Sequence, residues 1–304
     1  MTAQLTLGPV QYNWAPEDWR DFYFRIADET PIHTVFLGEV ICSKRAPLYD
    51  NQLPDVVERL HDAGKEVVFS TLSEVTTDID RRLVKRVAIS EGFPIEANDV
   101  SALQQMGQDP HYIGPLMNCY NEEALAVYAE NGAKSICLNP EMPKVGIAEL
   151  AEAAKPYDVA LEVQVYGRMS LALSARCYHA RAHNRTKDSC LFVCDQDPDG
   201  MRLDTLEGDE FLTVNGIQTQ SHSILNLVEC LDELQEIGIN RLRISPQSIG
   251  TFTAISAFDD VLRDKISPSE ALKKMRDDRV DAPFSNGFFY QRPGYEWHDK
   301  MPAE

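Results

Sequence analysis

Short apolar runs alternate along this chain with longer segments in which apolar residues recur every three or four positions. A short, nearly continuous apolar run is typical of a strand buried on both faces, as in a parallel sheet. The longer pattern predicts helices with one apolar face. We predict helices at residues 53–63, 122–130, 147–154 and 223–237. We predict strands at residues 5–8, 34–38, 66–70, 94–97, 112–116, 135–138, 160–165 and 241–245.

The regular alternation of strands and helices favours an α/β fold. Gly64, Gly132 and Gly238 follow three of the predicted helices, at positions where glycine commonly ends a helix. Eight such units match a (β/α)8 barrel, the TIM-barrel architecture, which needs about 250 residues. An open, doubly wound sheet is the alternative, because the order of strands in space cannot be read from the sequence.

The spacing becomes irregular after the seventh predicted strand. Residues 167–220 hold three of the seven cysteines and the turn-forming sequence DQDPDG at 195–200. We interpret this segment as an insertion at the C-terminal end of a barrel strand, where barrel enzymes keep their active sites. Residues 265–304 are predicted to form a C-terminal helix and an irregular tail. No linker interrupts the pattern, so residues 1–304 are expected to form a single barrel domain.

The composition narrows the function classes. Asp and Glu outnumber Lys and Arg by 48 to 29, which gives a net charge of −19 and disfavours nucleic-acid binding. The first residues lack a charged segment followed by an apolar run, and no apolar stretch reaches the length of about 18 residues that indicates a transmembrane helix. We therefore expect a cytoplasmic protein without a transmembrane segment, whose cysteines are not paired in disulfides.

Four cysteines are the candidate functional residues. Cys177, Cys190 and Cys194 have the spacing C-x12-C-x3-C, and Cys42 directly follows the second predicted strand. All four are expected at one face of the barrel, where four thiolates can hold a metal or an iron–sulfur cluster. We expect Cys177 to end a helix that begins near Arg168, and Cys190 and Cys194 to share one helical turn.

The cysteine segment is basic although the chain is acidic. Cations there would offset the negative charge of a thiolate site; they are Arg168, Arg176, Arg181, Arg185 and Lys187. Arg176, which adjoins Cys177, is the candidate for contact with the ligands. The alternative for these cations is a solvated helix face.

Several alternatives compete for these residues. The cysteines could simply be buried apolar side chains, an interpretation that suits Cys119, Cys137 and Cys230 better. Zinc sites favour C-x2-C pairs, which are missing, so the asymmetric spacing favours an iron–sulfur cluster over zinc. His179 and His183 have the spacing of a zinc pair but lack the Glu of H-E-x-x-H, so we expect them beside the site or on the surface. The sequence at 195–200 departs from a calcium loop and predicts a tight turn.

The chain has no dinucleotide, P-loop, nucleophile-elbow or H-E-x-x-H motif. Glu39, Glu96 and Glu162 lie at or near predicted strand ends, where catalytic acids often occur. Each could equally bond to a backbone amide or an arginine, so none is predicted to be catalytic.

Three segments resemble the collagenase-like peptidase family, in particular its bacterial UbiV branch. They are LGEVICSKR at 37–45, GRMSLALSARCYHARAHNRTKDSCLFVC at 167–194 and NGIQTQS at 215–221. The resemblance implies a TIM-barrel-like fold with a [4Fe–4S] cluster on Cys42, Cys177, Cys190 and Cys194. It also implies a heterodimer with a UbiU-like protein that carries its own cluster, and a UbiT-like lipid carrier. Together these proteins serve oxygen-independent ubiquinone biosynthesis, in which the rings of quinone precursors are hydroxylated under anaerobic conditions.

Three functions are therefore open. The first is an iron–sulfur subunit of an oxygen-independent hydroxylase, in which four thiolate ligands favour electron transfer over direct binding of substrate. The second is a peptidase or related hydrolase, as the name of the wider family suggests. The third is a non-catalytic protein in which zinc or a cluster holds the cysteine-bearing insertion in place.

Overall fold

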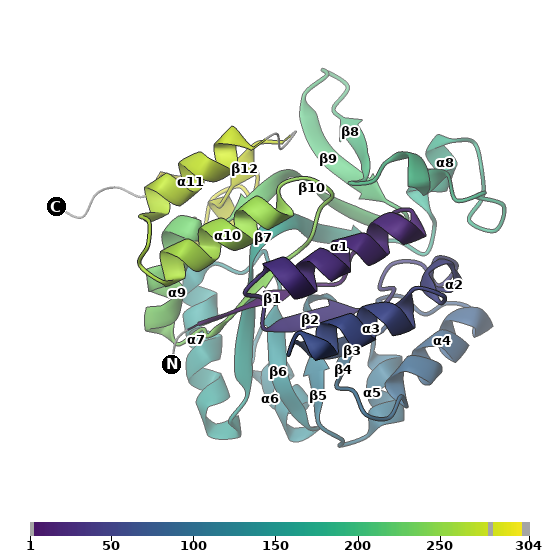
Figure 1. Cartoon of the computed structure of the whole chain (residues 1–304), viewed down its shortest axis with the longest axis horizontal. Coiled ribbons are helices and arrows are strands. Elements are labelled where there is room, and N and C mark those ends of the chain that lie inside the picture. Colours follow the sequence, from purple (N-terminus) through teal and green to yellow (C-terminus); the bar gives the residue numbers. More distant parts are fainter. Residues whose placement is uncertain (1–2, 279–281, 300–304) are drawn as a thin grey trace.

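Parallel strands close into a barrel at the centre of the structure, a computed structural model that describes residues 3–278 and 282–299 (Figure 1). The last barrel strand pairs with both the first and the seventh, which closes the ring. The predicted (β/α)8 barrel is confirmed, and the open sheet is ruled out. The barrel strands are β1 (Gln4–Leu7), β2 (Thr34–Leu37), β3 (Glu66–Ser70), β4 (Ile95–Ala97), β5 (His111–Ile113), β6 (Ala133–Leu138), β7 (Ala160–Leu173) and β11 (Arg241–Ile244).

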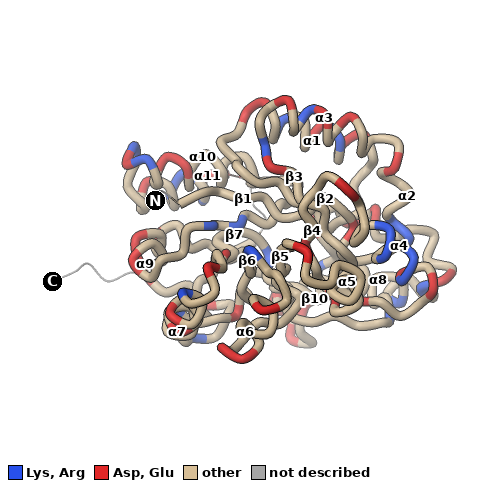
Figure 2. Tube along the Cα trace, turned by 90° about the horizontal axis from the view of Figure 1, so that it is seen from below, with Lys and Arg blue, Asp and Glu red and all other residues tan. Residues whose placement is uncertain are grey.

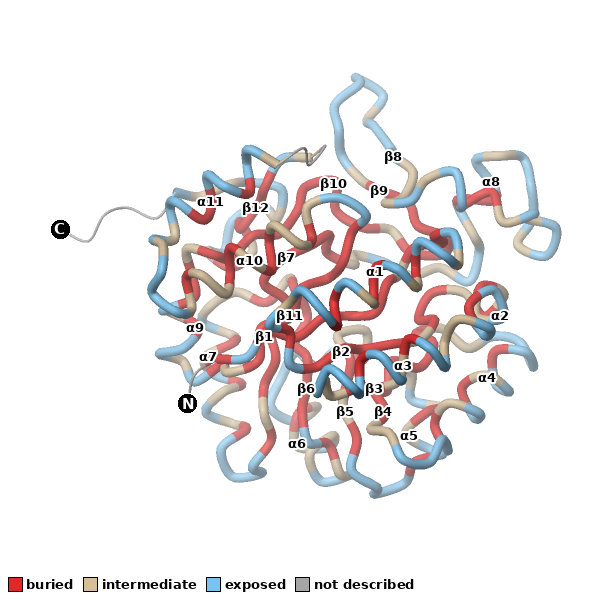
Figure 3. Tube along the Cα trace, viewed as in Figure 1, coloured by how far each residue is buried: buried red, intermediate tan, exposed pale blue. Residues whose placement is uncertain are grey.

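Helices cover the outside of the barrel, and their inner faces are buried against the strands (Figures 1 and 3). None of the helices in the described part of the chain has the length and apolar character that crossing a bilayer requires. The helices around the barrel are α1 (Pro16–Glu29), α2 (Ala46–Tyr49), α3 (Leu53–Asp62), α4 (Asp78–Ala88), α5 (Val100–Met106), α6 (Glu122–Glu130), α7 (Lys144–Ala154), α9 (Leu231–Ile237), α10 (Thr251–Leu262) and α11 (Pro268–Asp277).

The helix predicted at 223–237 is wrong in its first half. Residues 223–226 belong to β10 (Gln218–Asn226), and the helix α9 begins only at Leu231. Ile224 and Leu225 are both buried, because β10 lies between β7 and β12 (Phe284–Ser285) and is covered on both faces. Two adjacent apolar residues fit a strand buried on both faces as well as a helix, so the pattern alone does not separate the two.

β7 is much longer than predicted. Its first half lies in the barrel and pairs in parallel with β11, whereas residues 166–173 pair antiparallel with β10. The helix expected from Arg168 to Cys177 is therefore wrong, because the backbone of Arg168 takes part in this ladder. The insertion expected at 167–220 begins as an extension of a barrel strand.

The rest of the insertion lies above the C-terminal ends of the barrel strands (Figure 1). It contains the short helix α8 (Tyr178–Ala182), the 3-10 helix η3 (Val193–Gln196) and a hairpin of β8 (Met201–Asp204) and β9 (Glu210–Asn215). The tip of this hairpin is exposed (Figure 3). The C-terminal segment predicted at 265–304 contains α11, β12 and the 3-10 helix η5 (Gly287–Tyr290); residues 279–281 and 300–304 of that prediction lie outside the described residues.

Charged residues fill the barrel interior. Arg243 on β11 donates to Glu162 on β7 and, at 2.6 Å, to Glu96 on β4, which is not a neighbouring strand. Thr6 donates to Glu162 at 2.5 Å, and Ser70 donates to Glu96 at 2.7 Å. Both carboxylates thus bond to an arginine. This is the structural role that the sequence suggests as the alternative to catalysis. Burial raises the pKa of Glu162, but Arg243 and Arg241 outweigh burial, and the net pKa is lowered.

Arg243→Ala should lower the free energy of unfolding by about 3–5 kcal/mol at neutral pH, because it leaves buried Glu96 without its arginine and leaves Glu162 with only the more distant Arg241. Urea denaturation followed by circular dichroism measures this loss. A group with a lowered pKa stabilises the fold above its unfolded pKa, and this contribution disappears as the pH falls through the lowered value. The gap between variant and wild type should therefore narrow in acid. Arg263→Ala removes an exposed pair with Asp259 and should change nothing measurable; equal losses in the two variants would contradict the assignment.

Candidate metal centre

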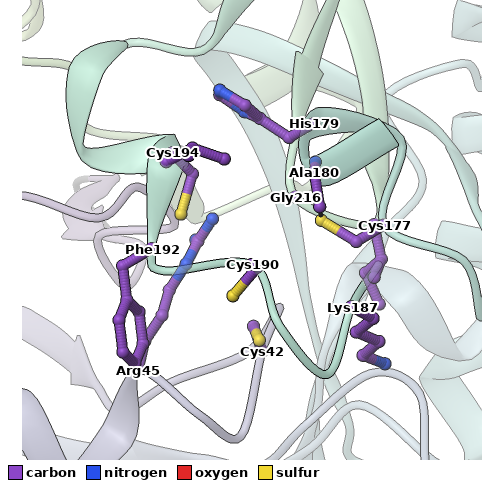
Figure 4. Close-up of a pocket in the computed structure, with 12 residues that line it drawn as sticks. Cys42, Arg45, Cys177, His179, Ala180, Lys187, Cys190, Phe192, Cys194 and Gly216 are labelled. Carbon is purple, nitrogen blue, oxygen red and sulfur yellow. Dashed lines mark hydrogen bonds between the residues drawn. The ribbon is translucent and has the colours of Figure 1, made fainter. Parts of the chain in front are cut away.

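Four cysteines from distant parts of the chain line one pocket, and their sulfur atoms point into it (Figure 4). Cys42 lies in the loop between β2 and α2, and Cys177 is the residue before α8. Cys190 precedes η3, which contains Cys194. All four are free thiols. The structure therefore brings together the four cysteines that the sequence singles out.

The loop that carries Cys42 is held by Glu39. Its carboxylate accepts hydrogen bonds from the backbone N–H groups of Ile41 at 2.8 Å and Cys42 at 2.9 Å. The loop begins at Gly38, which has a φ of +123° and lies so close to β3 that a Cβ would come within 2.6 Å of the Ser70 carbonyl oxygen. Only glycine fits there. Glu39 therefore fixes the shape of the loop. This is the structural role considered for it above, in which the carboxylate bonds to backbone amides.

The later cysteines are held by different local structures from those predicted. Cys177 begins a helix instead of ending one, since its Sγ accepts the backbone N–H of Ala180 at 3.4 Å. Cys190 and Cys194 do not share a helical turn, because Leu191 and Phe192 between them have φ of +50° and +54°. A left-handed residue other than glycine costs roughly 1–2 kcal/mol. Two in succession indicate that contacts elsewhere fix this turn.

The cation within the pocket is Arg45. Its side chain is only 1% exposed, and its Nη1 donates to the Gln11 carbonyl at 2.9 Å while its Nη2 donates to Asn215 Oδ1 at 3.1 Å. Burial lowers the pKa of Arg45, but Glu39, Cys194 and Cys42 together outweigh burial and raise it. Its Nε is buried and has no hydrogen-bond acceptor of ordinary geometry among the residues that the structure describes. Arg45 thus brings a permanent charge to the four thiols, and Cys194 is close enough to interact with it.

Arg176 lies elsewhere. It is exposed and is not part of the pocket lining. Among the five cations predicted to act there, Lys187 lines the pocket, and Arg168 instead donates to the carbonyls of Ser221 and His222. The sequence signal for a cation in the pocket is the pair Lys44 and Arg45, which follows Cys42. Cations chosen because they lie near the later cysteines do not include this pair, since it belongs to another segment of the chain.

Lys44 joins the two cysteine loops. Its ammonium donates to the carbonyls of Lys187 at 2.8 Å and Asp188 at 3.0 Å, and it lies 3.7 Å from Cys190 Sγ. The loop before Cys190 is therefore tied to the loop that carries Cys42. On the far side, Asn13 Nδ2 donates to Cys194 Sγ at 3.5 Å.

The segment NGIQTQS holds the side chain of Arg45 in place. Asn215 accepts from Arg45 and donates to the Gln11 carbonyl at 2.7 Å, and Gln218 donates to Gln11 Oε1 at 2.9 Å. Gly216 has a φ of +62°, and a Cβ there would lie 3.0 Å from Arg45 Nη2. The motif therefore holds Arg45 and lines the pocket with Gly216 and Ile217, without contributing a ligand atom.

Cys42 and Cys177 are costly to ionise without a positive partner. Burial raises the pKa of Cys42, and Arg45 opposes this shift. Burial also raises the pKa of Cys177, while the Ala180 N–H and Arg45 oppose it. A metal that replaces the protons removes this cost, since metal ions bind the thiolate form. An all-sulfur donor set with an adjacent buried cation fits zinc or an iron–sulfur cluster.

A histidine–aspartate pair adjoins the pocket. His179 lines it, and its Nε2 lies 2.8 Å from Asp197 Oδ2. His183 stacks on His179 with ring centroids 5.8 Å apart, so the three side chains could offer ligand atoms to an ion. Burial lowers the pKa of His179, and Asp197 opposes that shift. The turn at 195–200 is closed by the Gly200 N–H, which donates to the Asp197 carbonyl at 2.9 Å.

The three remaining cysteines are buried away from the pocket. Burial raises the pKa of Cys119 to about 11. Cys137 lies in β6, and Cys230 contacts the Tyr290 hydroxyl at 3.4 Å.

Comparisons with known proteins identify a family. The sequence profile of peptidase family U32 matches residues 16–299. Among solved structures, the N-acetylneuraminate lyase of Fusobacterium nucleatum is 10% identical with a TM-score of 0.46, over 90% of this chain and 79% of the lyase. A Pseudomonas aeruginosa protein provisionally identified as a dihydrodipicolinate synthetase is 10% identical with a TM-score of 0.45, over 91% of this chain and 81% of that protein. Both are too distant to bear on the chemistry of the site.

Mild oxidation of the iron-free protein with diamide should form disulfides only among the four cysteines of the pocket, because their sulfur atoms face one another. Mass spectrometry of proteolytic peptides identifies the pairs. Cys119, Cys137 and Cys230 should remain thiols, because each is buried and none of them lines the pocket. A disulfide that includes one of these three in the folded protein would contradict the placement.

Proposed function

The chain belongs to peptidase family U32, and we propose that within this family it is a UbiV-like iron–sulfur subunit of an oxygen-independent hydroxylase that acts on ubiquinone precursors. One observation carries the proposal: four free cysteines line a single pocket around a buried arginine. The resemblance of three segments to the UbiV branch supplies the pathway, and two of these segments contain the four cysteines.

The residues of the pocket have different roles in this proposal. Cys42, Cys177, Cys190 and Cys194 would hold a [4Fe–4S] cluster, which supplies one-electron redox chemistry when it is bound. Arg45, Lys44 and Lys187 offset the negative charge of four thiolates. Asn13 donates to Cys194 and thereby adjusts the electron density of that sulfur. Four thiolate ligands leave no open position for a substrate, which supports electron transfer as the role.

The proposed substrate is an aromatic quinone precursor with an isoprenoid tail. Such a tail is insoluble in water, so the proposal includes a UbiT-like lipid carrier that presents the precursor. It also includes a UbiU-like partner with its own cluster. Hydroxylation oxidises the ring by two electrons, and the oxygen donor, held elsewhere in the assembly, is the oxidant that gives up its oxygen atom and is reduced by two electrons. The subunit proposed here passes electrons between its cluster and that site.

A peptidase is the second candidate, because the family is named for this activity. The hydrogen-bonded pair of His179 and Asp197 beside the cysteines has the form of a base and its orienting group. No hydrogen bond joins His179 to a cysteine in the described part of the chain, and the thiol of Cys177 instead accepts a backbone N–H. A peptidase would keep its activity after iron is removed and lose it in His179→Ala.

Anaerobically purified wild-type protein should be brown and contain about four irons per chain. Single alanine variants of Cys42, Cys177, Cys190 and Cys194 should each lose most of the iron, as measured by colorimetric iron assay and visible absorbance. Cys119→Ala is the matched control, since it removes a buried thiol outside the pocket, and it should retain iron.

The outcome separates the candidates. Colourless protein with one zinc per chain would indicate a structural zinc site instead of a cluster. Equal iron contents in the two groups of variants would refute the ligand assignment. Cleavage of peptides by iron-free protein would favour the peptidase.

Arg45→Gln should lower the reduction potential of the bound cluster, because a nearby positive charge favours the reduced, more negative state. The effect of one charge at an effective dielectric of about 20 is about 1–2 kcal/mol, or about 40–90 mV for one electron. Electrochemical titration followed by electron paramagnetic resonance measures it. Arg45→Lys retains the charge and should shift the potential less, and Arg176→Gln should not shift it. A potential insensitive to Arg45 but sensitive to Arg176 would contradict this role.

A further inference from the structure

Helix α4 carries an unusual concentration of positive charge for this chain. Four of its eleven residues are Lys or Arg, whereas the whole protein has a net charge of −19. Figure 2 shows these cations gathered along α4 at one end of the molecule. Arg81 pairs with Asp78 at 2.9 Å. The other three, Arg82, Lys85 and Arg86, are exposed, and no ion pair engages them among the described residues; we call these three the α4 basic face.

Part of this charge has a local explanation. Lys85 and Arg86 lie in the last turn of α4, and Asp78 and Asp80 in the first, an arrangement that complements the helix dipole. The dipole does not account for Arg82 in the middle of the helix. Nor does it account for the apolar surface that lies between the cations.

A groove of about 240 Å³ runs between α4 and α2. Its apolar part is formed by Ala46, Pro47, Ile79 and Leu83, and Arg82 and Arg86 stand at its edge. Ile79 is 57% exposed. An apolar centre with a charged rim is the usual anatomy of a protein–protein interface. A nucleic acid needs no such apolar centre, so the groove favours a protein.

The groove adjoins the loop that carries Cys42. Ser43, which follows Cys42, lines the groove, and its hydroxyl donates to Asp80 of α4 at 2.5 Å. The same carboxylate accepts the N–H of Thr77 at 2.8 Å, so one buried group ties the Cys42 loop to the start of α4. A protein seated in the groove would lie one residue from a proposed cluster ligand.

We propose that the α4 basic face and its groove are the docking surface of a small acidic electron-transfer protein that reduces the cysteine site. The inference rests on the proposed redox function and specifies its electron donor by chemistry. One electron leaves the reduced iron–sulfur or flavin centre of the donor and is taken up at the cysteine site; no proton or heavy atom moves. The donor is oxidised by one electron and this protein is reduced by one.

Charge complementarity argues for an acidic donor. The acidic remainder of this protein repels such a donor, whereas the α4 basic face attracts it, so the encounter is steered to the end of the molecule that carries Cys42. Electron-transfer complexes are small and short-lived, and a groove of this size, lined by Arg82 and Arg86 with Lys85 on the same helix, suits them.

The test uses reduced plant-type [2Fe–2S] ferredoxin as the acidic probe and iron-loaded protein with its oxidised cluster. Stopped-flow absorbance gives the second-order rate constant at increasing salt, and isothermal titration gives the affinity. The double variant Arg82→Glu and Arg86→Glu should lower the rate constant at low salt by about tenfold or more, and the wild-type rate should fall as salt is added.

The matched control is the double variant Lys273→Glu and Arg276→Glu on α11. It makes the same change in net charge on exposed positions at the opposite end of the molecule (Figure 1). It should stay within about twofold of wild type at equal ionic strength, because exposed charges beyond a Debye length are screened. Equal losses in the two double variants, or a wild-type rate that rises with salt, would overturn the proposal.

Two further probes decide the class of partner. Vesicles of anionic phospholipid and a single-stranded DNA oligomer should bind no more tightly to wild type than to the α4 double variant. If vesicles or DNA bind in a way that depends on Arg82 and Arg86, the partner of this surface is a membrane or a nucleic acid instead of an acidic protein. Iron content is measured first in every sample, so absence of the cluster refutes the proposed function. An intact cluster that is reduced equally fast in wild type and in the α4 double variant refutes this inference alone.

Discussion

The buried guanidinium of Arg45 is the interaction on which the cysteine pocket depends. A charge inside a protein must be compensated, and here the partners come from separate segments: the carbonyl of Gln11 after β1, the carboxylate of Glu39 after β2, and the side chain of Asn215 at the end of β9. Cys194, in the insertion, contributes its sulfur to the same environment. The pocket can therefore assemble only when the barrel has closed and the insertion has folded back over it, which couples the site to the whole fold.

β7 makes that folding back geometrically possible. Its first half completes the barrel against β11, and its second half leaves the barrel and pairs with β10. The change occurs near Gly167, whose φ is +111° and where a Cβ would lie 2.5 Å from the Ser245 carbonyl oxygen. One strand thus belongs to two sheet environments, with a glycine between them. The extension places the start of the insertion above the barrel, and α8, η3 and the hairpin follow from there.

The sequence predicted those features that depend on local periodicity or on residue type. Eight strands, their parallel direction and the choice of four cysteines are of this kind, because apolar runs and rare side chains are visible in one dimension; the order of the strands in space is not. The helix at 223–237 failed because paired apolar residues such as Ile224 and Leu225 also suit a strand with two covered faces. Arg176 was chosen for its adjacency to Cys177, whereas Arg45 reaches the pocket through a loop on another strand. The left-handed Leu191 and Phe192 lack any glycine signal, since tertiary contacts impose their conformation.

The location of the pocket constrains how its chemistry can be used. Arg243, Glu96 and Glu162 occupy the barrel axis and satisfy one another, so the interior at that level is structural core. The cysteines instead lie at the rim, between the β2 loop and the insertion, where Lys187 and the exposed Leu191 are neighbours. A site at the rim suits exchange of electrons with another protein surface, because electron transfer needs proximity and no enclosed substrate chamber. It suits a substrate with an isoprenoid tail only when that substrate is presented from outside, which is the task proposed for the carrier and the partner subunit. The placement of the thiols and the filled axis together favour an electron-transferring subunit over a self-contained enzyme.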